Sequence, residues 1–397
     1  MLLSKRIQSI KPSPTLAMNA KAVSMKQSGV DVISFGVGEP DFDTPMHIRE
    51  AAKQAMDNGM TRYTAVGGIP ELKTAIIKKF KKDNGLAYQP EEVMVSCGGK
   101  HVLYNLAQAV LNPGDEVIIP APYWVSYPPI AVLADAKPVT AQTSPRDNFK
   151  LSAETLRRLA TPQTKLLVLN SPSNPTGAVY SKPELEALAE VVLEKDLFVV
   201  SDEIYEKLIY DDIPFCSIAE LGEEIKAKTL IVNGVSKTYA MTGWRIGYAA
   251  GDSAVVSAMT KIQSQSTSNP NAIAQKAAVE ALTGPQDSVG EMTRIFSERR
   301  AYLVNRLNGI AGVRCDNPEG AFYAFADFSH YFTKENEGRP IGGSAGLCEY
   351  LLTEAQVALV PGIAFGADDF VRFSFATSLE LIEKGLNRIE SALAKLS

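Results

Sequence analysis

The segment that decides the fold is residues 235–247, V-S-K-T-Y-A-M-T-G-W-R-I-G. It lies between two apolar segments, 229–233 and 245–250, and each of them is predicted to be a strand. Lys237 therefore follows the end of a predicted central strand, where the protein can remove water from the amine and make it nucleophilic. A solvated loop lysine is the alternative, because lysine is seldom buried. Other parts of the sequence are needed to distinguish a desolvated, nucleophilic lysine from a solvated one.

Strands and helices alternate along the chain on the N-terminal side of this segment. The predicted strands are apolar throughout, as expected for strands that are covered on both faces. This alternation predicts an α/β fold, with a mostly parallel central sheet and helices on both faces. The predicted strands are 93–96, 116–120, 166–170 and 197–201, and the predicted helices are 45–59, 70–80, 99–111 and 183–193.

The pattern changes after about residue 290. A long helix at 291–307 precedes three separated strands and a last helix, which is the pattern of a smaller α+β domain. We therefore expect a large domain at 46–290 and a smaller domain at 291–397 that includes the N-terminal segment 1–45. The predicted elements of the smaller domain after its first helix are strands 321–327, 357–360 and 371–375 and helix 379–396.

Composition excludes several classes of function. The chain has 397 residues and a net charge of -5, with no dense basic stripe, which argues against general nucleic-acid binding. The four cysteines and three histidines are scattered, so neither a metal site nor a disulfide framework is predicted. The N-terminal residues lack the apolar core of a signal peptide, and no run approaches the ~20 apolar residues of a membrane span. The cytoplasm is the expected compartment.

Polar residues follow four of the predicted strands. In open α/β sheets ligands bind outside the carboxyl ends of the strands, so these residues are expected to converge on one rim. They are Gly98, Gly99 and Lys100 after the first strand, Asn174 in the loop after 166–170, Asp202 and Tyr205 after 197–201, and Ser236 and Lys237 after 229–233.

Each of these groups has both a chemical and a plain structural interpretation. The turn at Gly98 and Gly99 is an anion site or simply a helix start. Asp202 is a buried partner for a cation or a helix N-cap. Arg245 binds phosphate in a bidentate manner or forms a surface ion pair, and Asn174 belongs to a ligand site or to an ordinary turn.

At this point the chain resembles a known family, the class I/II pyridoxal-phosphate-dependent aminotransferases of fold type I. The resemblance rests on S-P-S-N-P-T-G at 171–177, S-D-E-I-Y at 201–205, S-K-x-x-x-M-T-G-W-R-I-G-Y at 236–248 and V-R-F-S at 371–374. Within the family the chain is similar to the prokaryotic-type aspartate aminotransferases (subgroup Ib). The features in common are N-A-K-A at 19–22, G-E-P-D-F-D-T-P at 38–45, G-G-K at 98–100 and P-Y-W-V-S-Y-P at 122–128.

The resemblance implies a set of cofactor contacts. Lys237 is expected to bind pyridoxal 5'-phosphate covalently and to move the substrate proton. Asp202 is expected to pair with the ring nitrogen, which keeps the ring an electron sink. The other implied contacts are Tyr205 and Asn174 at the ring oxygen, Trp124 on the ring face, the backbone groups of Gly99 and Lys100 with Ser236 and Arg245 around the phosphate, and Tyr63 reaching the phosphate of the neighbouring subunit's cofactor.

The resemblance also implies the substrate contacts, with two departures from the family pattern. Arg372 is expected to bind the substrate α-carboxylate, with Gly38, Asn174 and Trp124 nearby. Gly234 stands where many members have a serine, so one phosphate contact is missing or supplied otherwise. No arginine occurs between positions 245 and 294, where many members carry one for the distal carboxylate. Lys100 is the candidate to replace it, and Lys11 is a weaker one.

The implied function is ping-pong transfer of the amino group of L-aspartate to 2-oxoglutarate, with the cofactor alternating between its pyridoxal and pyridoxamine forms. Tyr63 implies a homodimer with shared active sites. Alternatives within the fold are an aspartate/prephenate or aromatic aminotransferase and a C–S lyase. Two further alternatives are not enzymes: a non-catalytic cofactor-binding module and a purely structural protein.

Overall fold

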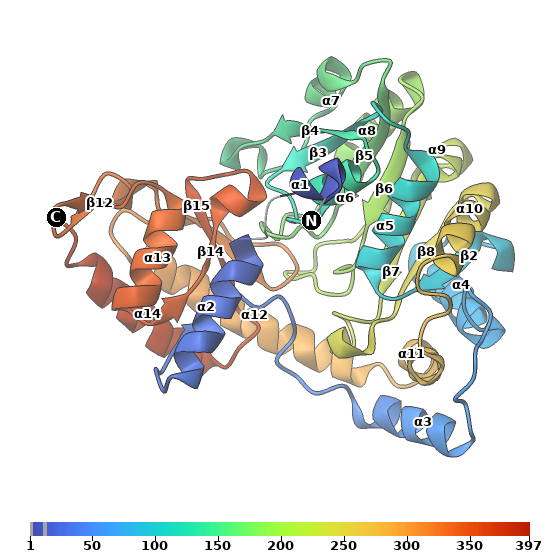
Figure 1. The fold of residues 1–397 in the computed structure, drawn as a ribbon, viewed down its shortest axis with the longest axis horizontal. Coiled ribbons are helices and arrows are strands. Elements are labelled where there is room, and N and C mark those ends of the chain that lie inside the picture. The colour runs from blue at the N-terminus through green and yellow to red at the C-terminus, as the bar shows by residue number, and fades with distance from the viewer. Residues whose placement is uncertain (1–2, 11–13) are drawn as a thin grey trace.

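A seven-stranded sheet forms the centre of the larger part of the structure (Figure 1). The computed structural model describes residues 3–10 and 14–397. The strand order is β2-β8-β7-β6-β5-β3-β4. The strands are β2 (Val93–Ser96), β3 (Glu116–Ala121), β4 (Lys137–Gln142), β5 (Thr164–Asn170), β6 (Phe198–Asp202), β7 (Thr229–Gly234) and β8 (Gly247–Ala250).

Most neighbouring strands of this sheet run parallel, as predicted. β8 is the exception, because it pairs antiparallel with both β2 and β7. The sequence predicted every strand except β4, whose residues are mostly half-buried or exposed and include Pro138. β4 lies at the edge of the sheet, where one side of the strand needs no partner and proline is tolerated.

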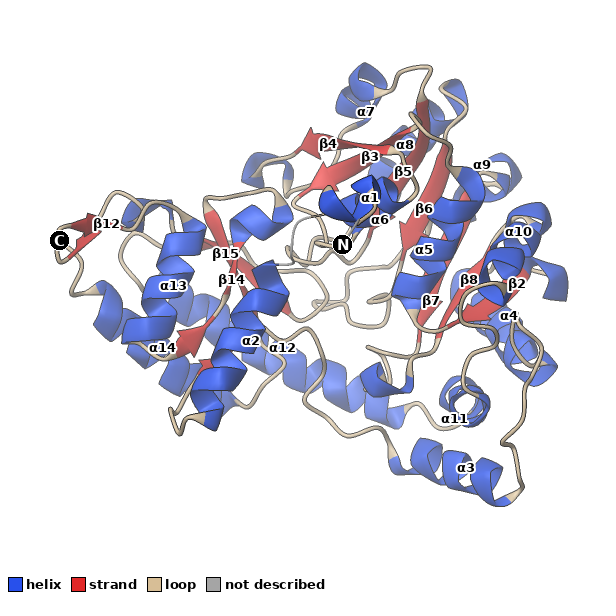
Figure 2. Cartoon of the chain, viewed as in Figure 1, coloured by secondary structure: helices blue, strands red, loops and turns tan. Residues whose placement is uncertain are grey.

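Helices cover both faces of the central sheet (Figure 2), and this too was predicted. Successive strand residues point to opposite faces. Met94 packs with α5 (Gly99–Val110) and α10 (Ser253–Ser264) on one face. Its neighbours Val93 and Val95 pack on the other face, with α4 (Pro70–Asn84) and α11 (Ala272–Thr283).

Local sequence signals set the ends of several helices. α4 starts with Pro70, and Gly85 follows it in the left-handed conformation at φ 68°. Ser181 and Glu184 form a reciprocal capping box at the start of α8. The remaining helices of this part are α3 (Met46–Asp57), α6 (Tyr127–Leu133), α7 (Ala153–Leu159), α8 (Lys182–Glu194) and α9 (Glu223–Ala227), with 3₁₀ helices at Pro90–Glu92, Pro145–Asp147, Ile218–Leu221 and Thr242–Trp244.

A second, four-stranded sheet lies in the other part of the molecule, in the order β14-β15-β10-β9. The long helix α12 (Asp287–Asn308) runs between the two parts (Figure 1). The elements here are β9 (Arg314–Cys315), β10 (Tyr323–Asp327), β14 (Val360–Pro361), β15 (Phe370–Ser374), α13 (Ser344–Glu354) and α14 (Leu379–Leu393), with the hairpin β11 (Glu335–Asn336) and β12 (Arg339–Pro340) and 3₁₀ helices at Ser329–Tyr331 and Gly362–Phe365.

The N-terminal segment joins this second part through a strand pair, although its first helix lies against α6 of the larger part. β1 (Ile33–Ser34) pairs parallel with β13 (Val357–Ala358). The N–H of Ser374 donates to the carbonyl oxygen of Phe35 at 2.8 Å, which extends the contact towards β15. Two helices precede β1, namely α1 (Lys5–Gln8) and α2 (Pro14–Gln27).

The structure corrects some predicted boundaries. Predicted strand 357–360 is two short strands, β13 and β14, which pair with different partners. β8 begins at Gly247 and not at Arg245, because Arg245 adopts the left-handed conformation at φ 58°, which no strand residue has. Helices α6, α7, α9, α10, α11 and α13 were not predicted. Within residues 3–10 and 14–397, no helix is both long and apolar enough to cross a membrane.

Candidate active site

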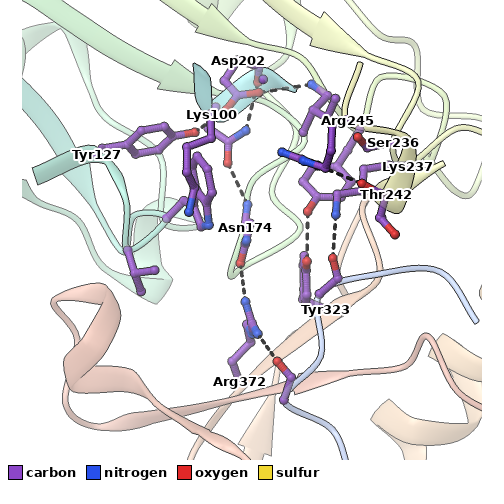
Figure 3. A pocket seen from close by; sticks show the side chains of 18 residues that line it. Lys100, Tyr127, Asn174, Asp202, Ser236, Lys237, Thr242, Arg245, Tyr323 and Arg372 are labelled. Atoms are coloured by element: carbon purple, nitrogen blue, oxygen red, sulfur yellow. Dashed lines mark hydrogen bonds between the residues drawn. The ribbon is translucent and has the colours of Figure 1, made fainter. Parts of the chain in front are cut away.

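A cavity of about 370 Å³ opens at the carboxyl ends of the central strands, beside the second sheet (Figure 3). It gathers residues from both parts of the molecule. The predicted site residues that line it are Gly38, Gly99, Lys100, Trp124, Asn174, Asp202, Tyr205, Ser236, Lys237, Arg245 and Arg372.

Lys237 holds its amine inside this cavity. Its Nζ donates a 2.6 Å hydrogen bond to the carbonyl oxygen of Gly38. The pKa of Lys237 is lowered to about 8. Burial is the main cause and the charges of Arg245 and Arg372 act in the same direction, while Glu39 and Asp202 oppose them. A desolvated amine with a lowered pKa has a substantial neutral fraction near neutral pH, as a nucleophilic lysine requires.

Asp202 lies buried at the end of β6. Its carboxylate accepts a 2.8 Å hydrogen bond from the Tyr127 hydroxyl and a longer one, at 3.4 Å, from the Ile204 N–H. Burial raises the pKa of Asp202 to about 6, although these hydrogen bonds and Lys237 act in the opposite direction. A cationic group in the cavity would favour the ionised carboxylate.

The start of α5 and Arg245 form an anion-binding corner. Gly98 lies at φ 89°, and a Cβ atom there would come within 2.3 Å of an Arg245 guanidinium nitrogen. A glycine is therefore needed for the guanidinium to lie against the helix start. Arg245 donates to the carbonyl oxygens of Thr242 at 2.8 Å and of Cys97 at 3.4 Å. The N–H groups at a helix start and a guanidinium together favour a phosphate-like ligand.

Arg372 reaches the opposite side of the cavity from β15. Its two terminal nitrogens donate to Asn174 Oδ1 and to the Gly36 carbonyl oxygen, both at 2.9 Å (Figure 3). Its buried Nε has no hydrogen-bond partner among the described residues. The guanidinium is therefore oriented but not neutralised, which suits it to bind a carboxylate.

Side-chain amides connect the two sides of the cavity. Asn170 donates to the carbonyl oxygen of Asp202 at 2.9 Å, and its Oδ1 accepts from the Asn174 N–H at 2.8 Å. Asn174 in turn accepts from Arg372. The orientation of Arg372 is thus tied through side chains to the end of β6.

Lys100 and Trp124 lie together on another wall. The Lys100 Nζ lies 4.9 Å from the centroid of the Trp124 ring, and burial together with the Arg245 charge lowers the pKa of Lys100. Trp124 also meets the Tyr127 ring edge-on at 5.4 Å. Lys100 is thus a cationic group that lines the same cavity as Arg372.

Of three other residues that the sequence singled out, two do not line this cavity. Tyr63 is 92% exposed and does not line it. Lys11 lies outside the described residues. Gly234 is buried in β7, where a Cβ atom would come within 3.0 Å of the Ile246 carbonyl oxygen, so the strand packing leaves little room for a side chain.

The sequence analysis missed Tyr127, Thr242 and Tyr323, which also line the cavity, and gave no specific role to Asn170 at the end of β5. Tyr127 and Thr242 lie inside motifs that were recognised, so these two had a signal. Tyr323 had none, because it lies in an apolar strand of the second sheet.

These observations test whether the site fits a phosphorylated, nitrogen-containing ring. The buried Asp202 suits a ring cation, and the corner at Gly98 and Arg245 suits a phosphate. Lys237 supplies an amine that lines the same cavity. The residues present therefore fit such a group.

Comparisons with known proteins agree with this chemistry. The chain matches the family described as aminotransferase class I and II over residues 30–389. It is 50% identical to the aspartate/prephenate aminotransferase of Nitrosomonas europaea, over 99% of this chain and 100% of the relative. It is also 50% identical to the aspartate aminotransferase of Bacillus sp. (strain YM-2), over 98% of each.

Solved structures that resemble this chain include aspartate aminotransferases as well. The aspartate aminotransferase from Rhizobium meliloti superposes with a TM-score of 0.97 at 47% identity, and the comparison covers 100% of both chains. The Thermus thermophilus aspartate aminotransferase with maleate gives 0.93 at 45% identity, over 99% of this chain and 100% of that one. The protein belongs to the class I and II aminotransferases, and the predicted family, fold class and enzyme class are confirmed.

Proposed function

We propose that the protein is an aspartate aminotransferase that transfers the amino group of L-aspartate to 2-oxoglutarate. The observation that carries this proposal is one cavity lined by the Lys237 amine, by the buried carboxylate of Asp202 and by the unneutralised guanidinium of Arg372. The names of the relatives from Bacillus and Rhizobium support the same substrate.

The proposed cofactor is pyridoxal 5'-phosphate. When bound, it supplies an electron sink for the carbanion that forms when the substrate loses its α-proton. Lys237 holds the cofactor and moves that proton. Asp202 pairs with the ring nitrogen, and Tyr205 and Asn174 donate to the ring oxygen. The remaining proposed contacts are Trp124 against the ring face and, around the phosphate, the backbone groups of Gly99 and Lys100 together with Ser236 and Arg245.

Arg372 is the proposed site for the substrate α-carboxylate. A carboxylate there would gain the bidentate geometry that guanidinium groups favour, and the hydrogen bond to Asn174 holds the guanidinium in place. Gly38 and Trp124 complete the proposed contacts on this side. Lys100 is the proposed partner of the distal carboxylate, because it is a second cation that lines the cavity.

A second candidate is an enzyme that also uses prephenate as amino acceptor. The relative from Nitrosomonas europaea carries that double name and aligns over 100% of its length. Prephenate also has two carboxylates, so Arg372 and Lys100 would serve it as well. The two candidates differ in acceptor and not in the chemistry at Lys237.

We also propose a homodimer, supported by the 92% exposure of Tyr63 outside its own cavity. The proposed division into domains is 46–290 and 1–45 with 291–397, supported by the separate second sheet. The cytoplasm is the proposed compartment, since the four cysteines are free thiols, which persist in reducing surroundings.

The experiment that tests the function is a half-reaction followed by absorbance. Purified enzyme loaded with pyridoxal phosphate is mixed with aspartate, glutamate, phenylalanine or the amino acid formed from prephenate. Rapid conversion to the pyridoxamine form by aspartate and glutamate alone is expected. Conversion by the prephenate-derived amino acid as well would establish the double activity. Release of pyruvate and ammonia from an added sulfur amino acid such as cystathionine, with loss of its thiol group, would instead indicate a C–S lyase. Lys237→Ala should abolish every conversion.

A further inference from the structure

Two buried tyrosine hydroxyls meet at the wall of the cavity. The hydroxyl oxygens of Tyr205 and Tyr323 are 2.9 Å apart, and the two rings meet edge-on at 5.9 Å. Tyr205 follows β6 of the central sheet, whereas Tyr323 begins β10 of the second sheet. This hydrogen bond therefore joins the two parts of the molecule.

The number of hydrogens fixes the direction of this bond once Tyr205 has its proposed partner. A tyrosine hydroxyl carries a single hydrogen to donate. If Tyr205 donates to the ring oxygen of the cofactor, the hydrogen between the two tyrosines has to come from Tyr323. Tyr323 is free to donate it, because no other hydrogen bond joins its hydroxyl to a described residue.

The hydroxyl of Tyr323 is held in a defined place. A Cβ atom at Gly38 would come within 2.8 Å of it, so that only a glycine leaves room for the hydroxyl against this backbone. Tyr323 itself is 1% exposed and is packed among aromatic residues, with its ring centroid 4.7 Å from that of Phe322. The hydroxyl therefore has little freedom to turn towards water or another acceptor.

Tyr323 also contacts the proposed substrate-binding arginine. The guanidinium carbon of Arg372 lies 4.4 Å from the centroid of the Tyr323 ring, within the range of a cation–π interaction. Burial raises the pKa of both tyrosines, and the charge of Arg372 lowers the pKa of each. The charge on Arg372 thus makes both hydroxyls better hydrogen-bond donors. A carboxylate bound at Arg372 would offset that charge.

We propose that Tyr323 is a positioning residue that donates its hydrogen to Tyr205 and transmits carboxylate binding at Arg372 to the bond between Tyr205 and the cofactor. This inference rests on the proposed function. It gives the second sheet a part in setting the properties of the cofactor, in addition to binding the substrate. Tyr323 acts only through Tyr205 and does not itself touch the reacting atoms.

The test is a pH titration of the absorbance of the loaded enzyme, with and without saturating maleate, a dicarboxylate that has no amino group to transfer. Four variants are compared with the wild type: Tyr323→Phe, Tyr205→Phe, the double variant, and Tyr350→Phe. Tyr350 is the matched control, because its buried hydroxyl in the second part donates to the Ala392 carbonyl oxygen, away from the cavity.

Tyr323→Phe should raise the midpoint of this titration by about half a unit to one unit, the effect expected from one neutral hydrogen bond. The reason is that Tyr205 becomes a weaker hydrogen-bond donor to the ring oxygen of the cofactor. The weaker bond favours the protonated form of the enzyme-bound cofactor. The shift caused by maleate should shrink in the same variant. In the Tyr205→Phe background, Tyr323→Phe should add nothing, and Tyr350→Phe should match the wild type.

Two results would overturn the proposal. One is an unchanged midpoint in Tyr323→Phe, even if the variant is less stable or less active, because that would leave only a structural role. The other is an equal shift with and without Tyr205, because the effect would then bypass that hydroxyl. A wild-type enzyme that gives no titrating band would contradict the proposed function instead, so the two failures are distinguishable.

Discussion

The Tyr127 hydroxyl donates a 2.8 Å hydrogen bond to Asp202 Oδ2 at the buried end of β6, yet the pKa of Asp202 still lies at about 6 because burial outweighs this bond. The carboxylate is therefore held in an unfavourable environment when the cavity contains no cation. This is a cost in stability that the proposed function explains, since a ring cation would remove it.

Asp202→Asn should stabilise the cofactor-free protein at pH 8. The folded-state pKa of about 6 lies above the ordinary 3.8, so the native state binds more protons than the unfolded state between these values. The contribution of the Asp202 carboxyl group to the free energy of unfolding therefore falls as the pH rises from about 4 to about 6. Above that range the ionised carboxylate costs the folded state roughly 3 kcal/mol, at 1.36 kcal/mol per pKa unit.

Urea unfolding of the cofactor-free protein at pH 8 and pH 4 measures this effect. The Asn variant should gain stability at pH 8 and little at pH 4, and it should lose nearly all transaminase activity. Asp57→Asn, at an exposed position at the end of α3, is the control and should change neither. An Asn variant that is less stable than wild type at pH 8 would contradict the expected cost.

Arg372→Lys should weaken substrate binding although the charge is kept. The lysine cannot reproduce the two hydrogen bonds to Asn174 and Gly36 or present a planar fork to a carboxylate. Loss of a charge-assisted hydrogen bond of about 1.5–3 kcal/mol predicts a KM for aspartate about 10- to 100-fold higher. Steady-state kinetics check this, with Arg306→Lys on α12 as a control. An unchanged KM would remove Arg372 from the substrate site.

Lys100→Met should act on dicarboxylic substrates in particular. If Lys100 binds the distal carboxylate, the KM for aspartate should rise about tenfold while that for alanine hardly changes, because alanine has no second carboxylate. Methionine keeps much of the side-chain length over Trp124. Lys82→Met, at an exposed position near the end of α4, is the matched control. Equal losses with both substrates would assign Lys100 to the cofactor alone.

Tyr63→Ala and Lys237→Ala should complement each other when mixed. Each variant alone should be inactive or nearly so if Tyr63 completes the partner's site. In mixed dimers, one site combines an intact Lys237 with the partner's Tyr63. Half of the dimers are then mixed and each has one intact site, so activity should return to about a quarter of the wild type. No recovery after mixing would refute shared sites.

The central sheet was predictable because its strands are buried on both faces and so are apolar throughout. Edge strand β4 lacks that signal, since its outer side needs no apolar residue. The departure of Arg245 from its predicted strand had no signal either. Its left-handed conformation belongs to the turn that places the guanidinium at Gly98, a contact between residues far apart in the chain.

The polar residues that line the cavity were predictable for a similar reason. The carboxyl ends of parallel strands meet at one edge of the sheet. The position of Asp202 and Lys237 directly after predicted strands was therefore enough to predict that they lie at this edge. Tyr323 does not, because a tyrosine in an apolar strand looks like any core residue. Its relation to Arg372 arises where β10 pairs with β15, and single-sequence reasoning has no access to that register.

The pairing of β1 with β13 has a consequence for how the protein is made. Ile33 pairs with Val357, so this strand has no partner until most of the chain has left the ribosome. Domains otherwise tend to fold from the N-terminal side as they emerge. The side chains of Ile33 and Phe35 are apolar and are buried in the folded protein. During synthesis they therefore stay exposed to water, or bound to a chaperone, until β13 has been made. The part of the site that is proposed to bind the substrate carboxylate depends on Gly36, which follows Phe35. That part can therefore form only at the end of translation.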